Sequence, residues 1–437
     1  MSDLSVKFAG KKLRSPLGIA SHAVFNGGLV DPLAEAEHLR KYVDQGAGFV
    51  YTPFINNEDE HPADAPPAWK FMNIHSRSPF AMEGLLVATE ARRIMCRLNP
   101  GLTLIETLRE NLPDDVAVIA NMIGPGADAE AWAEHCRLAQ DSGADIIEMN
   151  VSCPIPAAEA SAVTNYCRGE LCEAAGALLG DSPNLLIPVV EAVVKAVDIP
   201  VGVKFTPETG FPRLVALAQG VRDAGAAFVS GINAPISVAP PDIYKGGQGK
   251  WPGLKDNPIC AALGPWDRFL LYRNLGTISA FVPGIELTGI GGLVEPEHVV
   301  EAMMLGARIC QLSSGLLWKG TGLIKECLDF LDSYMASQGY KSVEEFIGLG
   351  VQYIKPVEQL DWRCEDFLAT VDDRLCTRCG RCATGICTAR KLMENPSRIV
   401  IDSRLCVGCG LCQAICPENA VSMVEQRHPV LGFSMQQ

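Results

Sequence analysis

The stretch Gly284–Gly315, which reads GIELTGIGGLVEPEHVVEAMMLGARICQLSSG, holds the pattern that decides the fold. A short apolar segment runs into a glycine-rich turn, and the helix-forming segment that follows ends at Gly306-Ala307. A second apolar segment then ends in Ser-Ser-Gly. Glycine suits the left-handed residue that ends a helix, and alanine packs closely against the next strand. The stretch therefore predicts two strands joined by one helix.

The same Gly-Ala pair precedes an apolar segment at three earlier places, beginning at positions 46, 143 and 225. Counted to position 306, the successive intervals are 97, 82 and 81 residues. A βα unit of a large barrel takes roughly 30 to 45 residues, so each interval has room for two units. This count predicts an α/β fold, a (β/α)8 TIM barrel, with strands near Leu17–Ser21, Phe49–Thr52, Val116–Met122, Ile146–Val151, Val201–Phe205, Phe228–Ile232, Ile285–Gly289 and Ile309–Leu312.

An open, doubly wound sheet is the competing architecture, which the strand count disfavours. Long insertions at 55–80, 154–184 and 234–264 are predicted to be irregular and to lie over the mouth of the barrel. We assign residues 1–338 to the barrel, 339–373 to a connector with a short helix at Val343–Leu349, and 374–437 to a separate ferredoxin-like α+β module.

The C-terminal module contains two cysteine runs. The first has the spacing C-x2-C-x2-C-x4-C and the second has C-x2-C-x2-C-x3-C-P, and their ligands are Cys376, Cys379, Cys382, Cys387, Cys406, Cys409, Cys412 and Cys416. In two-cluster ferredoxins each run gives three thiolates to one [4Fe–4S] cluster and its fourth to the other. One cluster would then take its fourth ligand from Cys416, and the second cluster would take its own from Cys387.

A pair of zinc sites is the alternative reading of these cysteines. Structural zinc usually takes two separated C-x2-C pairs for each ion, whereas three cysteines at this spacing followed by Cys416-Pro417 are typical of clusters. The first run departs from the ferredoxin pattern, because it has four residues before Cys387 and no proline after it.

The bulk composition describes a globular protein with an ample core. The chain has 437 residues, of which 48% are hydrophobic and 20% charged, and its formal charge is −14. The negative charge argues against nucleic acid or an anionic membrane as the main partner. The sequence shows no membrane-length apolar run and no signal-peptide core, so we expect a cytoplasmic protein. Its 17 cysteines, nine of them scattered outside the two runs, fit a reducing compartment.

A phosphate site is predicted where strands seven and eight end, from Gly289, Gly291, Gly292, Ser313, Ser314 and Gly315. Barrels commonly bind phosphate there with glycine backbone N–H groups and a helix N-terminus. A plain turn is the alternative for the glycine-rich segment alone. No G-x-G-x-x-G follows a strand, so the sequence predicts no NAD(P)-binding domain.

Four segments carry a family resemblance: Asn150–Pro154, Lys204–Pro207, Asn233 and the glycine-rich loop. With them the chain resembles the dihydroorotate dehydrogenases. With the appended cysteine runs it is similar over nearly its whole length to the pyrimidine-reducing subunits of bacterial dihydropyrimidine dehydrogenases. The resemblance implies bound FMN and two [4Fe–4S] clusters.

The resemblance also implies roles for individual residues. Cys153 would exchange a proton with the substrate carbon opposite the flavin, and Lys204 would face the flavin N1–C2=O edge. Ala20 and Ser21 would contact the flavin. Substrate would be bound by Asn73, Asn150 and Asn233. The sequence itself places His75 and Arg77 beside Asn73, where they face either an anionic or carbonyl-rich substrate or only solvent.

The chemistry supports these roles independently. Hydride transfer to an activated C=C bond leaves a carbanion that needs a proton from the other face, and a positioned neutral thiol can supply it. Asparagines can bind carbonyl and amide edges with both a donor and an acceptor. The alternatives are a packed core cysteine at Cys153 and a solvated lysine at Lys204. A lysine inside the apolar strand Val201–Phe205 is hard to explain by solvation.

Three departures touch the substrate side of the site. Tyr51-Thr52-Pro53 offers no lysine at the end of strand two, Glu208 replaces an asparagine, and Ala234 replaces a threonine. The sequence therefore predicts reduction, or reversible oxidation, of an activated C=C or C=N bond. It does not identify the substrate.

Electrons would pass through the clusters from an FAD/NAD(P)H-binding subunit or from a ferredoxin, in a homo- or hetero-oligomer. The rival hypotheses are a non-catalytic electron-transfer subunit of a larger complex and a true dihydroorotate dehydrogenase.

Overall fold

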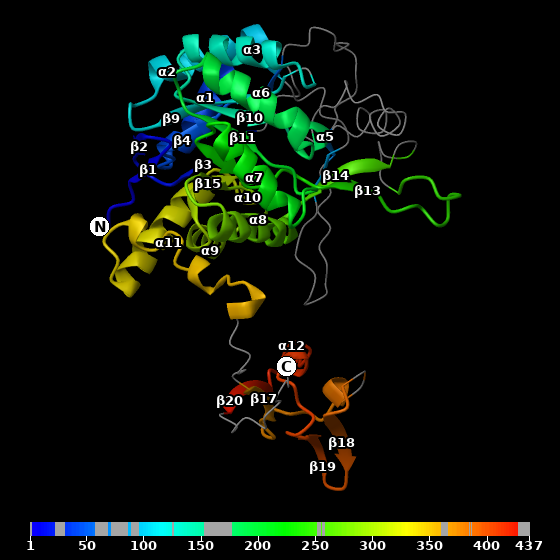
Figure 1. The fold of residues 1–437 in the computed structure, drawn as a ribbon. Coiled ribbons are helices and arrows are strands. Elements are labelled where there is room, and N and C mark those ends of the chain that lie inside the picture. Colours follow the sequence, from blue (N-terminus) through cyan, green and yellow to red (C-terminus); the bar gives the residue numbers. More distant parts are fainter. Residues whose placement is uncertain are drawn as a thin grey trace. The chain divides into compact units, whose positions relative to one another are not determined.

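Eight parallel strands close into a barrel in the first part of the chain (Figure 1). Each strand pairs with the next, and the last returns to the first, so the eight strands form a closed ring. They are β3 (Leu17–Ile19), β4 (Phe49–Tyr51), β9 (Ala117–Met122), β10 (Ile146–Asn150), β11 (Val201–Lys204), β12 (Phe228–Ser230), β15 (Glu286–Gly289) and β16 (Ala307–Leu312). The predicted barrel is confirmed and the open sheet is excluded.

The computed structural model describes residues 2–21, 31–56, 69–70, 86–88, 96–124, 126–152, 177–250, 255, 258–359, 366–383, 385 and 387–426. The chain divides into two compact units after Ile354, a position inside the predicted connector 339–373. The two units are described separately below.

Helices cover the outside of the barrel (Figure 1); they are α1 (Pro32–Asp44), α2 (Leu98–Asn111), α3 (Ala129–Asp141), α5 (Ala177–Gly180), α6 (Pro183–Ala196), α7 (Arg213–Asp223), α8 (Arg268–Phe281), α9 (Pro296–Met304), α10 (Ser314–Lys319) and α11 (Gly322–Gln338). One face of each barrel strand is covered by helices, and the other face packs in the interior of the barrel. All six residues of β9 are therefore buried.

The recurring Gly-Ala pairs follow the C-terminal ends of four of these helices. Gly46, Gly143, Gly225 and Gly306 have φ angles of 103°, 97°, 94° and 106°, which L side chains rarely adopt. Each alanine that follows is buried. The glycine thus ends the helix and turns the chain back into the barrel, as the sequence predicts.

The insertion at 234–264 is more regular than predicted. Its two ends form β13 (Ile236–Val238) and β14 (Ile259–Leu263), which pair antiparallel, and β14 also pairs with β7 (Leu86–Ala88). β6 (Trp69–Lys70) extends this sheet by pairing with β7. The expectation of an irregular segment is wrong because hairpin pairing satisfies backbone groups that a loop would leave open.

Shorter elements complete the first unit. β1 (Val6–Phe8) and β2 (Lys11–Leu13) form a hairpin, and β5 (Ile55–Asn56) and β8 (Cys96–Arg97) extend the barrel sheet beside β9. A 3₁₀ turn, η2 (Pro265–Asp267), leads into α8. The predicted helix at Val343–Leu349 is wrong in type, because only the 3₁₀ turn η3 (Val343–Glu345) forms there. A second 3₁₀ turn, η4 (Val351–Tyr353), follows.

The second unit begins with η5 (Val357–Gln359) and is built from two antiparallel strand pairs. β17 (Asp366–Val371) pairs with β20 (Val421–Gln426), and β18 (Arg390–Glu394) pairs with β19 (Ser397–Ile401). Two short helices, η6 (Arg381–Ala383) and α12 (Leu411–Ala414), carry cysteines of the two runs. This is the ferredoxin-like arrangement that the sequence predicts. Among the described residues, no helix is long and apolar enough to cross a membrane.

Candidate functional sites

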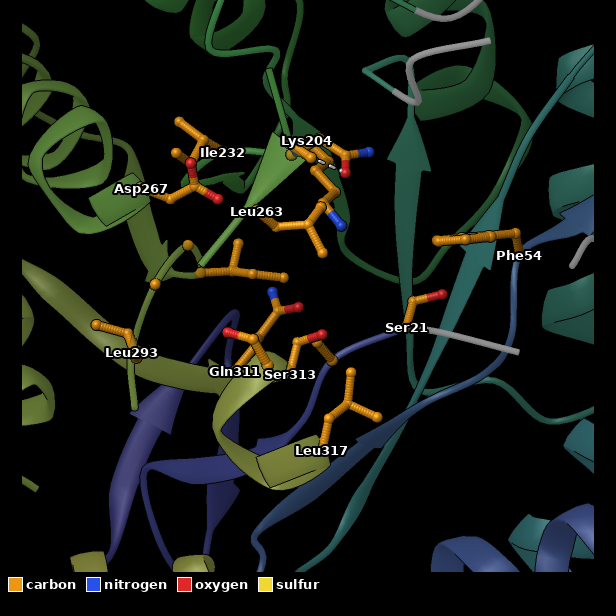
Figure 2. A pocket seen from close by; sticks show the side chains of 17 residues that line it. Ser21, Phe54, Lys204, Ile232, Leu263, Asp267, Leu293, Gln311, Ser313 and Leu317 are labelled. Atoms are coloured by element: carbon orange, nitrogen blue, oxygen red, sulfur yellow. Dashed lines mark hydrogen bonds between the residues drawn. The ribbon is translucent and has the colours of Figure 1, made fainter. Parts of the chain in front are cut away.

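A pocket opens at the carboxyl ends of the barrel strands, where barrel enzymes place their chemistry (Figure 2). Most of the predicted cofactor residues line it, together with one predicted substrate residue; these are Ala20, Ser21, Lys204, Asn233, Gly291, Gly292, Ser313 and Ser314. They come from the ends of β3, β11, β12, β15 and β16. The tertiary structure therefore brings together residues that lie almost 300 positions apart in sequence.

The two central glycines of the predicted phosphate loop are required by their surroundings. Gly292 has a φ of 68°, and a Cβ there would come within 2.6 Å of the Arg268 backbone nitrogen. Gly291 has a φ of 131°, and its Cβ would clash with the Ile232 side chain at 2.6 Å. The positive φ angles and the close packing around this turn both require glycine, and the turn lines the pocket.

Two further predicted cofactor residues do not line the pocket. A Cβ on Gly289 would meet the sulfur of Cys310 at 3.1 Å, and one on Gly315 would meet the Leu293 carbonyl at 2.9 Å. Close packing against these neighbours is enough to explain why both positions are glycine. A ligand contact at these two positions stays a prediction.

Four buried polar atoms in the pocket have no hydrogen-bond partner among the described residues. They belong to residues that all line the pocket, and they are Ser21 Oγ, Asn233 Nδ2, Asp267 Oδ1 and Gln311 Oε1. Leaving such atoms unpaired costs about 1–3 kcal/mol each, so a site of this kind is built to bind a polar ligand. Both donors and acceptors are present, which suits the mixed donor and acceptor edge of a flavin ring, its hydroxylated chain and its phosphate.

Lys204 is a basic residue that lines this pocket. It ends β11, is only 2% exposed, and its Nζ lies 6.0 Å from the centroid of the Phe54 ring. Lysines are almost never buried to this extent without a functional or paired role. A solvated surface lysine is therefore excluded, because the side chain is buried in the lining of the pocket.

Asp267 is a pocket residue that sequence reasoning missed. It is 2% exposed, and its Oδ2 accepts a hydrogen bond of 3.2 Å from the Gly264 backbone. Burial raises the pKa of its carboxyl well above the ordinary value, although the Gly264 hydrogen bond acts in the opposite direction. Sequence reasoning offered no signal for it, because it lies just after the insertion 234–264, in the turn that leads into α8.

A buried hydrogen-bond network lies inside the barrel beneath the pocket. Gln311 Nε2 donates to Tyr51 Oη and to Thr288 Oγ1, each at 2.9 Å, and Thr288 Oγ1 donates to Ser230 Oγ at 2.9 Å. Ser230 also donates to Glu148, which is 0% exposed. Burial, followed by the charge of Glu148, raises the pKa of Tyr51 well above its usual range.

This network reaches the predicted substrate residue Asn150. Glu148 Oε1 accepts from Asn121 Nδ2 at 2.7 Å, and Asn121 Oδ1 accepts from Asn150 Nδ2 at 3.1 Å. Asn150 Oδ1 accepts from the Ser152 hydroxyl at 3.2 Å. Sequence reasoning missed Glu148 and Gln311, although a charged or amide residue inside an apolar strand is the same signal that pointed to Lys204.

The substrate side is described only in part. Cys153, Asn73, His75 and Arg77 lie outside the described residues, and their predicted roles stay predictions. The departure at Glu208 has a local explanation, because its Oε1 accepts from the Ile236 backbone at 2.9 Å and anchors β13.

The cysteines of the second unit surround a second pocket. Three cysteines of the first run, Cys376, Cys379 and Cys382, line it together with Cys416 from the end of the second run. This is the set that the exchange of fourth ligands predicts for one cluster. Among the described side chains, no three of His, Cys, Asp or Glu meet closely enough to hold a single metal ion.

The two cysteine runs begin with the same local structure. The backbone N–H of Cys376 donates to the Asp372 carbonyl and that of Cys406 to the Asp402 carbonyl, each at 3.0 Å. Each aspartate is also paired with an arginine two residues later, at 2.8 Å. This repeat supports one cluster-binding turn in each half of the module.

Comparison with known proteins places both parts of the chain among redox enzymes. The dihydrouridine synthase (Dus) family profile matches residues 123–230, and that of the 4Fe-4S binding domain matches residues 399–422. The NAD-dependent dihydropyrimidine dehydrogenase subunit PreA of Escherichia coli K12 is 28% identical, over 87% of this chain and 84% of its own.

Catalytic subunits of dihydroorotate dehydrogenase B (NAD(+)) match as well. The one from Methanocaldococcus jannaschii is 31% identical over 57% of this chain and 74% of its own length. The one from Pyrococcus abyssi is 29% identical over 80% of this chain and 99% of its own.

Proposed function

The chain belongs to the dihydroorotate dehydrogenase-like family of flavin oxidoreductases, and we propose that it is an FMN-dependent member that reduces, or reversibly oxidises, an activated C=C or C=N bond of a small molecule. Electrons are relayed through two [4Fe–4S] clusters, as in a dihydropyrimidine dehydrogenase. The observation that carries this proposal is the pocket in which Lys204, the Gly291-Gly292 loop and four unpartnered polar atoms meet.

FMN is favoured over a dinucleotide flavin by the place of the predicted phosphate site. Two successive loops, at Gly291-Gly292 and Ser313-Ser314, line the pocket where strands seven and eight of the barrel end, which suits a single phosphate group. When bound, FMN supplies two-electron hydride chemistry. Lys204 places a positive charge where the reduced ring carries negative charge, and Ser21 and Gln311 orient the ring edge.

The protein's own acid is Cys153. Reduction of an activated double bond needs a proton at one carbon, and a neutral thiol can hold that proton until it is transferred. Asn73, Asn150 and Asn233 bind the polar edge of the substrate, and His75 and Arg77 lie beside Asn73 in sequence. A continuous hydrogen-bond network links Gln311 on the flavin side to Asn150 on the substrate side.

The electron donor is a separate protein. The chain carries cluster ligands but no dinucleotide fingerprint, which favours an FAD/NAD(P)H-binding subunit or a ferredoxin as partner, in a homo- or hetero-oligomer in the cytoplasm. The clusters convert single electrons to the two-electron chemistry of the flavin.

The test is anaerobic purification followed by cofactor analysis and a substrate screen. We expect about one flavin, released as FMN, with about eight iron and eight sulfide per chain. Zinc in place of iron, or four iron only, would contradict the cluster assignment. Oxidised and photoreduced protein would then be screened with pyrimidines, dihydropyrimidines, dihydroorotate and simple enoates while flavin absorbance is followed.

The screen also separates the rival functions. A change in flavin redox state with one class of small molecule supports the proposal, and a response to dihydroorotate alone would make the chain a dihydroorotate dehydrogenase. A flavin that exchanges electrons with the clusters but with no small molecule would instead favour a non-catalytic electron-transfer subunit.

A further inference from the structure

Gln311 presents one end of its amide to the pocket and the other end to the barrel interior. The side chain is buried, it lines the pocket together with Ser21 and Lys204 (Figure 2), and its Oε1 has no hydrogen-bond partner among the described residues. Its Nε2 faces the interior, where it donates to Tyr51 Oη and Thr288 Oγ1. The two ends of a glutamine amide have nearly the same shape, so their neighbours decide which end faces the pocket.

Two hydroxyl groups connect this amide to Glu148. Thr288 and Ser230 stand opposite each other in the register of β15 and β12, and the Thr288 hydroxyl donates to Ser230 Oγ at 2.9 Å. Ser230 in turn donates to Glu148 Oε2. A hydroxyl has one proton to donate, so each of these two groups must accept from the group before it. Thr288 must therefore accept from Gln311, which the amide nitrogen allows and the carbonyl oxygen does not.

The other side of the network also makes Glu148 an acceptor. The backbone N–H of Ser152, which can only donate, bonds Asn150 Oδ1 at 3.4 Å. The Nδ2 of Asn150 is then the donor to Asn121 Oδ1, at 3.1 Å. This in turn leaves Asn121 Nδ2 to donate to Glu148 Oε1, at 2.7 Å.

Glu148 thus accepts hydrogen bonds at both oxygens, as a fully buried carboxylate requires. Its Oε2 also lies 3.4 Å from Gln311 Nε2, so the carboxylate attracts that end of the amide directly. Both routes, through the hydroxyls and through this contact, turn the NH2 group of Gln311 inward and its carbonyl oxygen toward the pocket.

We propose that Glu148 is a positioning residue that keeps the carbonyl oxygen of Gln311 facing the pocket, so that the bound flavin must supply a hydrogen-bond donor there. A flavin has two kinds of donor, the N–H at N3 of its ring and the hydroxyls of its chain. A ligand with an acceptor at this point would leave the buried oxygen unpaired, which is costly. The inference rests on the flavin site of the proposed function.

Two substitutions change the direction of the network with little change of shape. In Glu148→Gln the new NH2 group can donate to Ser230, so the hydroxyls can reverse and Gln311 can turn its NH2 group to the pocket. Thr288→Val breaks the link between Ser230 and Gln311. The matched control is Glu35→Gln, which removes another buried carboxylate, on α1, that does not line the pocket.

The test is a double-mutant cycle of FMN affinity with Glu148→Gln, Gln311→Leu and the double variant. Full-length protein freed of flavin is titrated, and the quenching of flavin fluorescence is measured. We expect each of the two variants to bind FMN about 10-fold more weakly, the value of one buried hydrogen bond. The double variant should bind no more weakly than Gln311→Leu, and the control should bind as wild type does.

Flavin analogues identify the donor, since 3-methyl-FMN lacks the ring N–H and lumiflavin lacks the hydroxylated chain. A ring donor predicts that wild type prefers FMN to 3-methyl-FMN by roughly 10-fold and that Glu148→Gln and Thr288→Val lose this preference. A chain donor predicts that Glu148→Gln weakens the binding of FMN but not of lumiflavin. Neither pattern in a variant that binds FMN would overturn the inference.

The other outcomes are equally decisive. Losses that multiply in the double variant would mean that Glu148 acts on the site as a whole and not through Gln311, which overturns the inference. If Glu148→Gln does not fold, Thr288→Val takes its place in the cycle with the same expectations. Equal FMN affinity in all variants overturns this inference alone, whereas a wild-type protein that binds no flavin would refute the proposed function itself.

Discussion

Asn150 and Lys204 lie directly opposite each other where β10 and β11 end, as the last pair of that parallel register. In-register neighbours of a parallel sheet project from the same face, so both side chains point to one side of the barrel wall. Lys204 lines the pocket, and Asn150 is tied to Asn121 and Ser152. The proposed flavin and substrate sites therefore share this edge of the barrel.

Replacement of Cys153 tests the proposed acid. Cys153→Ser nearly preserves volume but supplies a far weaker acid, so turnover should fall by roughly 10²- to 10⁴-fold. FMN and iron content should be unchanged, and so should reduction of the flavin through the clusters, because that path needs no proton from this thiol. Steady-state turnover and stopped-flow flavin reduction would be compared in the same preparation.

The control for this variant is Cys136→Ser, which changes a fully buried cysteine on α3, away from the pocket. It should lower stability and leave turnover largely intact. Near-normal turnover of Cys153→Ser would make Cys153 a packing residue and favour an electron-transfer role for the chain.

Reduction by nicotinamide cofactors should depend on a partner. No dinucleotide fingerprint occurs in the sequence, so NADH or NADPH alone should reduce the isolated chain poorly. Addition of a flavoprotein partner or reduced ferredoxin should bleach the flavin. Flavin absorbance under anaerobic conditions measures the reduction. Rapid stoichiometric reduction by NAD(P)H without any partner would contradict this prediction.

Asp267 should contribute to flavin binding through its unpartnered Oδ1. A neutral carboxyl can donate a hydrogen bond to a phosphate oxygen, and Asp267 faces the same pocket as Gly291 and Gly292. Asp267→Leu should weaken FMN binding about 10- to 100-fold, the value of a hydrogen bond to a charged group. Asp267→Asn, which keeps a donor, should bind FMN nearly as well as wild type.

Riboflavin separates the two ways in which Asp267 could act. It lacks the phosphate, so a phosphate contact predicts that Asp267→Leu binds riboflavin as wild type does. An equal loss for FMN and riboflavin would place the contact on the sugar-like chain instead. Fluorescence quenching of added flavin by the apoprotein gives both affinities, and an unchanged FMN affinity in the Leu variant would contradict the prediction.

Stability should depend on the protonation of Glu35 in α1. Burial raises the pKa of this carboxyl to about 7 from an ordinary value of 4.5. The folded state therefore binds this proton more tightly than the unfolded chain. The stabilisation of the folded state by this bound proton is fully present below about pH 4.5, and it is lost as the pH rises through about 7.

Glu35→Gln removes this titration and keeps the shape of the side chain. Above pH 7 the variant should be more stable than wild type by up to about 3 kcal/mol, and the difference should vanish at low pH. Urea unfolding at several pH values measures it. Glu37→Gln, an exposed neighbour on the same helix, is the control and should show no such trend.

Local sequence determined the elements and the order in which they occur. The glycines at 46, 143, 225 and 306 end helices wherever they stand, because the left-handed conformation is a property of one residue. Apolar runs of a few residues after each of them predicted strands. The cysteine spacing likewise predicted cluster ligands, because a turn of a few residues already gathers three thiolates.

Only the tertiary structure decided which other residues lie beside these sites. Asp267 and Gln311 lie in different βα units and meet in one pocket because the barrel closes. Arg390 enters the cysteine module on a strand, and nothing in its neighbours predicted that it would be buried while Lys391 is exposed. Burial and the absence of a partner are properties of the packed chain, since they depend on distant residues that no local pattern contains.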